Sequence, residues 1–458
     1  MSSSSQTNDL KKRIIFTIFI LAVYRFGTFV PIPGIDPEQL QTMMSGNQKG
    51  LLGMFNVFSG GAVSRMAIFA LGIMPYISSS IIVQLLTGVS DYFKNLKAQG
   101  ETGRAKITQI TRYGTVVLAT IQGYGLSIGL QSSADLVINP GLFFTVTAVS
   151  TIVAGTMFLM WLGEQIDKYG IGNGVSLILT AGIIARMPNA VTWVWDNFST
   201  SQQSMSGGIG ILGVLFLIGA FVFVVAGAIV ITVAQRRIPI QQARHTRGRK
   251  VYGGGRHYLP LRVNHAGVMP IIFASSLLIF PSAFFGYLQS AANASPDPAS
   301  WWVATTTFLN ANFQMGEYPY IVLEIILIYF FSYFWTTIVF SPEDMARQLR
   351  DNGSFIPGLR PGPRTAEYLE TVVERITYVG AGFLAIIAVI PSIVSKEMQI
   401  PFLVSSFLGG TGLLIVVSVG LDLIQRIEAN LLMRNYKGFF DAQTQSRTGR
   451  ATRKPSGA

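Results

Sequence analysis

Side chains able to do covalent chemistry are sparse in this chain. An intramembrane hydrolase needs a serine beside a histidine or lysine, or two aspartates, within its membrane spans. Of the three histidines, His245 and His257 lie in a basic loop, and His265 lies at the mouth of an apolar run. The chain has no cysteine, which excludes disulfides and thiolate ligands, and its histidines are too few and scattered for a metal site. We therefore expect no catalytic residue, no cofactor, no metal and no enzyme.

Ionisable residues inside apolar runs are typical of secondary solute transporters. The candidates here are Arg25, Glu324 and Asp422, and none has a second charge at similar depth. A secondary solute transporter built on inverted repeats nevertheless stays open as the alternative function. In either case the energy for transport should come from a partner.

The composition is that of a polytopic membrane protein. Half of the 458 residues are hydrophobic, only 12% are charged, and the mean hydropathy is +0.46, whereas a soluble domain carries about 25% charged residues. The first 13 residues are polar and precede an apolar run without a small-residue cleavage pattern. This pattern indicates a first span rather than a removed signal peptide.

Ten membrane spans are expected from the apolar runs. They are 14–30, 67–86, 113–130, 142–162, 174–187, 209–233, 263–288, 320–340, 376–394 and 402–424.

Loop charge predicts the orientation. Of the 34 Lys and Arg residues, 29 fall at the N-terminus, in the even-numbered loops or in the tail 425–458. By the positive-inside rule this side is cytoplasmic, and so are both termini.

Two cytoplasmic loops are long and basic. The loop 235–262 shows strand-like alternation at 238–240 and 251–252 and a Gly253-Gly254-Gly255 tip. Its tip residues are Arg244, Arg247, Arg249, Lys250 and Arg256. The loop 341–375 has a short helical pattern and a Pro/Gly-rich tip that presents Arg360 and Arg364. Such loops suit anionic lipid headgroups, a polyanion such as ribosomal RNA, or an acidic protein surface.

The stretch from Met54 to Leu86 contains two unequal apolar runs. The first, 51–58, ends at Ser59-Gly60-Gly61, and the second begins after Arg65. A run of under about 14 residues is too short to cross a hydrocarbon core of roughly 30 Å. From the residues alone, the first run is either a re-entrant segment enclosed by protein or a helix at the membrane interface.

Seven motifs in one order resemble the SecY family, the channel subunit of the bacterial Sec protein-conducting channel, along almost the whole chain. They are FVPIPGID (29–36), MFNVFSGGAVSR (54–65), FALGIMPYISSSII (69–82), WLGEQI with GIGNG (161–174), LPLRVNHAGVMP (259–270), FIPGLRPG (355–362) and GGTGLLIVVSVGLD (409–422).

The resemblance implies an all-α membrane protein with ten spans in two pseudo-symmetric inverted halves around an hourglass pore. The halves would be 14–187 and 209–424, joined by an external hinge loop, 188–208. A short re-entrant plug helix would cover about 51–65 and sit in the external funnel. The plug residues are expected to be Phe55, Asn56, Phe58, Ser59, Gly60, Gly61 and Arg65.

The resemblance also implies a pore ring and a lateral gate. The ring positions are Ile73, Ile77, Leu179, Ile183, Ile272 and Ile415. Two pairs in this ring are spaced i, i+4, which places them on one helix face. Without the resemblance, lipid-facing or bundle packing would be the ordinary interpretation of each residue. The gate positions, between spans two and three and spans seven and eight, are Ser78, Gln84, Gln122, Asn264 and Phe280. Local backbone capping is an equal alternative for Gln122 and Asn264.

The function implied by the resemblance is the central pore-forming subunit of the general secretion translocase. Unfolded polypeptides would cross through the plugged constriction, and hydrophobic helices would leave sideways into lipid. Implied partners are SecE, SecG, the SecA motor ATPase, signal peptides, anionic lipids, and the ribosome with its nascent chain. The implied location is a bacterial plasma (inner) membrane. The tip around Arg244 to Arg256, with Arg360 and Arg364, is expected to dock the motor and the ribosome.

Overall fold

The structure is a computed structural model. It describes residues 3–36, 56, 59–132, 136–198, 210–242, 245–247, 250–252, 256–265, 267–294, 300–314, 316–397, 400–401, 404–405, 407 and 410–451.

One long helix corresponds to each expected span, in chain order. These helices are α1 (Ser3–Gly27), α4 (Met74–Val89), α6 (Glu101–Ser132), α7 (Leu142–Tyr169), α8 (Gly174–Asp196), α9 (Ile211–Val233), α10 (Met269–Ala294), α12 (Tyr318–Val339), α14 (Pro363–Glu397) and α16 (Thr411–Ala451). Among the described residues, α7, α8, α9, α12 and α14 lie in segments that are long and apolar enough to cross a membrane on their own, and α4 is apolar but shorter. The expected all-α polytopic fold is confirmed.

Several helices begin or end away from the expected bounds of the spans. α4 begins at Met74 rather than at residue 67, because Pro75 lies in its first turn and Gly72 before it has a φ of 57°. A positive φ ends regular structure, and proline favours the first helical turn. α8 continues through Pro188 to Asp196, so the first residues of the expected hinge loop are helical.

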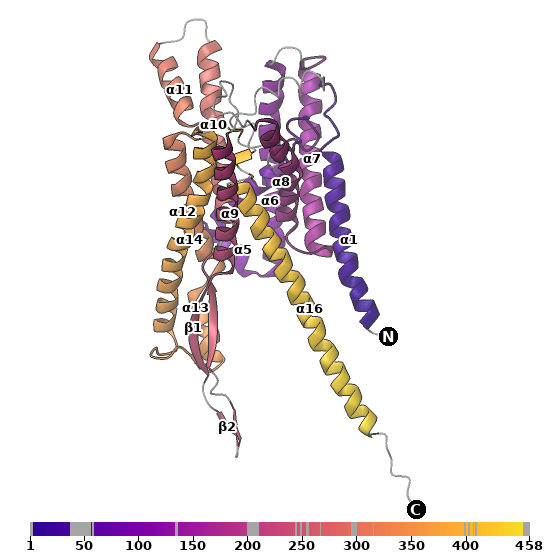
Figure 1. The fold of residues 1–458 in the computed structure, drawn as a ribbon, viewed down its shortest axis with the longest axis vertical. Coiled ribbons are helices and arrows are strands. Elements are labelled where there is room, and N and C mark those ends of the chain that lie inside the picture. Colours follow the sequence, from indigo (N-terminus) through magenta and orange to yellow (C-terminus); the bar gives the residue numbers. More distant parts are fainter. Residues whose placement is uncertain are drawn as a thin grey trace, which may run out of the picture.

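The helices pack within each half and meet across two seams. In the first half, α4 packs on α6, α6 on α7, and α7 on α8 and α1. In the second half, α10 packs on α12, α12 on α14, and α9 on α16. Contacts between the halves run from α4 to α10 and from α8 to α16. We call the first of these the α4/α10 seam. Figure 1 shows the bundle, with both chain ends on the side that carries the strands.

The two long basic loops fold into one small unit at that end. β1 (Gln235–Gln242) pairs antiparallel with β4 (Arg256–Arg262) and with β5 (Ser354–Phe355). β2 (His245–Arg247) and β3 (Lys250–Tyr252) form a second hairpin. Both stretches expected to be strand-like lie in these strands. The pairing of β5 with β1 joins the two loops, which the sequence did not predict.

An apolar core holds this strand-bearing unit together. It is formed by Ile238, Leu261, Phe340, Leu349, Ile356, Leu369 and Val373. Three short helices complete the described structure: α5 (Asp91–Ala98), α11 (Ser300–Asn312) and α13 (Pro342–Asp351). α13 contributes Leu349 to the core of the unit.

A close backbone approach between α7 and the segment before α4 gives a stability prediction. A Cβ built on Gly155 of α7 would overlap the carbonyl oxygen of Ile68, whereas Gly125 of α6 faces open space. We expect Gly155→Ala to destabilise the protein by about 1–3 kcal/mol, the usual cost of overpacking. Thermal unfolding of the purified protein, followed by loss of the monodisperse chromatographic peak, measures the change.

The matched control is Gly125→Ala, which should leave the unfolding temperature unchanged or raise it, since alanine favours a helix by up to about 1 kcal/mol over glycine. Equal unfolding temperatures for the two variants would contradict the close packing at Gly155.

Candidate functional site

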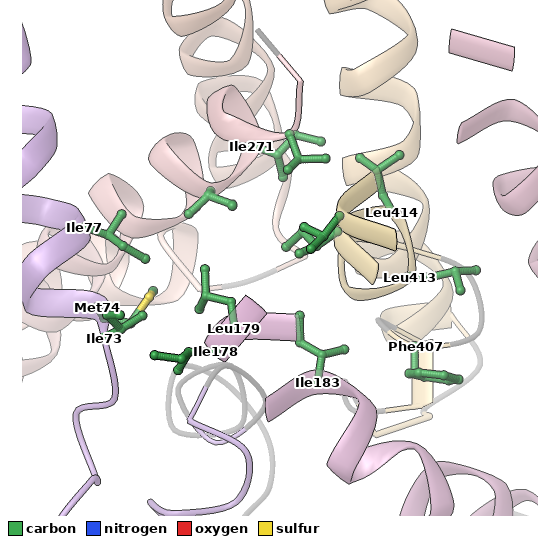
Figure 2. Close-up of a cluster of buried hydrophobic side chains, with 14 of the residues drawn as sticks. Ile73, Met74, Ile77, Ile178, Leu179, Ile183, Ile271, Phe407, Leu413 and Leu414 are labelled. Atoms are coloured by element: carbon green, nitrogen blue, oxygen red, sulfur yellow. The ribbon is translucent and has the colours of Figure 1, made fainter. Parts of the chain in front are cut away.

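The six expected ring residues lie together in the buried centre of the bundle. Each is at most 5% exposed, and all belong to one hydrophobic cluster: Ile73, Ile77, Leu179, Ile183, Ile272 and Ile415. They come from the start of α4 and from α8, α10 and α16, so both halves contribute. We call these six residues the aliphatic cluster. Figure 2 shows aliphatic side chains from α4, α8, α10 and α16 around the centre of the bundle.

The i, i+4 argument holds for only one of the two pairs. Leu179 and Ile183 are both within α8. Ile73 is the N-cap of α4, so it precedes the helix, although its carbonyl accepts the Ile77 amide at 3.1 Å. The start of α8 is itself fixed by two side chains: Asp167 Oδ1 accepts the Gly174 amide at 2.7 Å, and Asn173 Oδ1 accepts the Ser176 amide at 3.1 Å.

Neighbours of the expected ring residues extend the aliphatic surface. Figure 2 labels six further residues: Met74, Ile178, Ile271, Phe407, Leu413 and Leu414. Most of them directly adjoin a ring position in the chain. Periodicity alone could not select them, because apolar neighbours are ordinary in a membrane helix.

A glycine-rich turn lies against α1 and α8. We call residues 56 and 59–66 the glycine turn. Asn56 is helical, whereas residues 59–66 form turns, so the latter differ from the expected plug helix. The other residues of that expected helix, including Phe55 and Phe58, lie outside the described ones. Asn56 closes the turn, because its Oδ1 accepts the Ser64 amide at 3.0 Å and its carbonyl accepts the Gly61 amide at 2.9 Å. Asn56 and Ser59 are both buried.

Only glycine fits at the two tightest positions of this turn. Gly60 and Gly61 have φ values of 66° and 89°. A Cβ on Gly60 would lie 2.9 Å from Tyr24 Oη on α1 and 3.0 Å from Gly182 Cα on α8. The turn is therefore wedged between these two helices.

Three arginines lie at the glycine turn: Arg25, Arg65 and Arg186. The sequence did not predict that they lie together. Arg25 Nη1 donates to the Gly60 carbonyl at 2.8 Å. The Arg25 and Arg65 guanidinium carbons lie 4.9 and 4.1 Å from the centre of the Phe29 ring, within cation–π range. Arg186 of α8 is only 6% exposed and lies against Gly61.

The expected gate residues come from α4 (Ser78 and Gln84), α6 (Gln122), α10 (Phe280) and the segment before α10 (Asn264), and two of them make local hydrogen bonds. Gln84 Nε2 donates to Ser80 Oγ of its own helix at 3.0 Å, and Asn264 Nδ2 donates to the Gly267 carbonyl at 2.8 Å. The second bond fits the local-capping interpretation of Asn264. The buried Oε1 atoms of Gln84 and Gln122 have no partner among the described residues.

The remaining two expected gate residues, Ser78 and Phe280, lie in α4 and α10. Ser78 is buried in α4. Phe280 lies within α10, but its side chain is outside the described residues.

The expected docking residues are only partly described. Arg360 and Arg364 are exposed, and the Arg360 carbonyl accepts the buried Thr365 hydroxyl at 2.9 Å. Three of the docking residues belong to the strands β2, β3 and β4: Arg247, Lys250 and Arg256. Their side chains are outside the described part of the structure. Arg244 and Arg249 lie outside the described residues altogether. Arg236 and Arg237 of β1 are also exposed and were not singled out from the sequence.

A cavity of about 220 Å³, lined by both polar and apolar residues, lies between α8, α10 and α16. Its lining includes Asn173, Arg262, His265, Asp422 and Arg426. Burial, together with the nearby positive charge of Arg262, lowers the pKa of His265. Asp422 Oδ2 accepts from Arg426 Nε at 2.8 Å, so this carboxylate is paired near the strand-bearing end.

The other ionisable residues considered for a transporter are separate from one another. Arg25 binds the glycine turn, whereas Glu324 is buried in α12 and its Oε2 has no partner among the described residues. The three candidates therefore form no shared ion-binding site in the described part of the chain.

Comparison with known proteins gives one family. The SecY family profile matches residues 67–424. The protein translocase subunit SecY of Rickettsia bellii (strain RML369-C) is 43% identical over 439 residues, which cover 95% of this chain and 96% of the relative.

Two solved structures show the same fold. A protein-conducting channel aligns with a TM-score of 0.58 at 16% identity, over 92% of each chain. Sec61 from a canine ribosome–channel complex aligns with a TM-score of 0.57 at 15% identity, also over 92% of each chain. The sequence match spans nearly the full length of both proteins, and the central aliphatic cluster lies within the matched region. The chain therefore belongs to the SecY family.

Proposed function

We propose that this SecY-family translocon subunit passes unfolded polypeptides through the aliphatic cluster and releases hydrophobic helices through the α4/α10 seam. The observation that carries the proposal is the position of the aliphatic cluster, where side chains from both halves meet in the centre of the bundle. A gate at this position can open whenever the halves or the side chains move apart.

The chemistry of the cluster suits a gate for chains of any sequence. Its six members carry only branched aliphatic side chains, so a passing polypeptide meets no fixed hydrogen-bonding partner there. A narrow apolar constriction excludes ions by dewetting. The same surface can deform around a passing chain, because aliphatic side chains form no hydrogen bonds that would have to break.

The glycine turn would act as the plug. Its backbone is buried and irregular, which a membrane protein tolerates only where protein or a water-filled cavity surrounds it. The turn is held by the hydrogen bond from Arg25, by the bond from the Ile32 amide to the Met66 carbonyl at 2.8 Å, and by close contact with Tyr24, Gly182 and Arg186. These contacts are local, so the turn can leave without unfolding a helix.

The α4/α10 seam would act as the lateral gate. Gln84 of α4 and Asn264, which precedes α10, bond within their own segments. Among the described residues, no side-chain hydrogen bond joins α4 to α10. Since interhelical hydrogen bonds in membranes contribute only about 0.6 to 2 kcal/mol, separating these two helices would require little free energy.

The strand-bearing unit would dock partners on the cytoplasmic side. It presents Arg236, Arg237, Arg360 and Arg364 at the end of the bundle that also carries both chain ends. We propose that this end faces the cytoplasm of a bacterium and that the chain lies in the plasma membrane. SecA, and the ribosome with its nascent chain, would bind here. The structurally similar Sec61 is part of a ribosome–channel complex. SecE and SecG would complete the channel, and signal peptides would enter at the seam. We propose 188–208 as the hinge region between the halves.

Ion conductance tests the pore. Ile183 belongs to the aliphatic cluster, whereas its neighbour Ile184 is 47% exposed. We expect Ile183→Ala to raise the resting conductance of the purified complex in planar bilayers, because a wider constriction is more easily wetted. A decrease of about 1.4 kcal/mol in the barrier corresponds to about tenfold more leak.

The matched control is Ile184→Ala, which should stay as silent as the unmodified channel. If both variants are silent even with a motor and substrate present, the aliphatic cluster is not the gate.

Membrane insertion tests the seam. Gln84→Leu removes the buried, unpartnered Oε1, and an unsatisfied buried group costs about 1–3 kcal/mol. The closed seam should become more stable, so a segment should need higher hydrophobicity to insert. The measurement is the insertion threshold of a graded series of test helices. Gln131→Leu, which breaks the 2.7 Å bond to Thr145 between α6 and α7, should leave the threshold unchanged. An unchanged threshold in the Gln84 variant would contradict the gate.

Charge reversal tests docking. Arg360→Glu should reduce motor-driven translocation about tenfold, which corresponds to about 1.4 kcal/mol of lost binding, while the complex still assembles. In vitro translocation and co-purification measure the two properties. Lys94→Glu reverses an exposed charge on α5, outside the strand-bearing unit, and should translocate normally. Normal translocation by the Arg360 variant would count against docking at this tip.

A further inference from the structure

Three guanidinium groups meet at the glycine turn from three different segments. Arg25 lies near the end of α1, Arg65 lies in the glycine turn itself, and Arg186 lies within α8. Arg25 and Arg65 share the Phe29 ring. Arg186 lies against Gly61, the residue next to the Gly60 carbonyl that Arg25 contacts. We call these residues the arginine cluster.

The arginine cluster has no described counter-charge. Among the described residues, no carboxylate forms an ion pair with any of the three. Arginines elsewhere in the chain do find such partners. Arg112, for example, contacts both carboxylate oxygens of Glu164, at 3.0 and 2.6 Å.

Two donors in the cluster are buried without a partner. Arg65 Nη1 and Arg186 Nε are inaccessible to solvent and make no hydrogen bond to described residues. Arg186 is itself 94% buried, since only 6% of its surface is exposed. A buried charge without a counter-ion is strongly unfavourable, and so is a buried donor without an acceptor. The closed turn therefore brings together three positive charges and two hydrogen-bond donors that lack acceptors among the described residues.

We propose that the arginine cluster binds a small inorganic anion, such as chloride or inorganic phosphate. Guanidinium groups favour such ligands, because they keep their charge and present several donors in a plane. Arg25 also lines a cavity of about 520 Å³ between α1, α8 and α16, so free volume lies beside the cluster.

The anion would stabilise the closed position of the glycine turn. Arg25 and Arg186 contact Gly60 and Gly61 directly, and Arg65 ends the same turn. Neutralising their mutual repulsion favours the arrangement that brings them together. This effect on the channel rests on the plug role proposed above, whereas the binding site itself rests only on the arginines.

Binding is tested on the purified complex in maltoside micelles, which contain no lipid phosphate. Chloride-35 NMR line broadening reports chloride, gluconate serves as the inert counter-anion, and inorganic phosphate is added as competitor. We expect broadening in the unmodified complex, loss of it in Arg186→Gln, and no change in Arg112→Gln, whose guanidinium is paired with Glu164. Equal broadening in the unmodified complex and the Arg186 variant would overturn the site.

The effect on the turn is tested by thiol labelling. The chain has no cysteine, so Ala62→Cys introduces its only thiol at a fully buried position in the turn. If the anion binds only the closed form, labelling should slow about tenfold at an anion concentration ten times its Kd. The slowing should vanish in the Arg186→Gln background and persist in Arg112→Gln.

The outcomes separate the two proposals. Chloride binding that depends on Arg186, with labelling that ignores chloride, would support the site and overturn its control of the plug. Chloride-dependent labelling that survives Arg186→Gln would overturn the site. Ser59→Cys, at a second buried position in the same turn, provides the reporter if the Ala62 variant fails to fold.

Discussion

One constraint underlies the structure: the peptide groups of irregular backbone buried inside a membrane protein need hydrogen-bonding partners from the protein itself. A lipid bilayer offers no water to the peptide groups of a turn, so surrounding protein has to satisfy them. The glycine turn meets this requirement partly by itself, through Asn56, and partly through Arg25. Close approach by α1 and α8 is possible only because Gly60, Gly61 and Gly182 have no side chains in the way. The same features that bury the turn also bring the three arginines together.

The aliphatic cluster and the glycine turn differ in the kind of interaction that closes them. The cluster closes by apolar contact, which is non-directional and can adapt to many shapes. The turn closes by steric fit and by directional hydrogen bonds, one of them charged, which require a single arrangement. Two barriers with different chemistry can therefore respond to different signals, the first to a chain in the pore and the second to charge.

Much of the fold could be predicted from the sequence, because hydropathy and loop charge are strong signals in a membrane protein. The start of α4 and the end of α8 show the limits: Ile73 precedes its helix, and Pro188 does not end one. The pairing of β5 with β1 was beyond prediction, since a two-residue strand has no periodicity. The ring positions followed from the family resemblance alone, because aliphatic spacing cannot distinguish a pore from ordinary packing. Arg186 was treated only as a residue of an apolar run, because its neighbours in space come from distant parts of the chain.

The contacts of the glycine turn described above come from one half of the molecule. Tyr24 and Arg25 belong to α1, Gly182 and Arg186 belong to α8, and Gly72 before α4 adjoins Ser59. The α4/α10 seam, in contrast, lies between the halves. Separation of the seam therefore does not by itself break the contacts of the turn, and release of the turn does not require the seam to separate. α4 carries Ile77 of the aliphatic cluster and also borders the seam. Under the proposed function, crossing the membrane and leaving sideways into lipid would therefore share one constriction while using different motions.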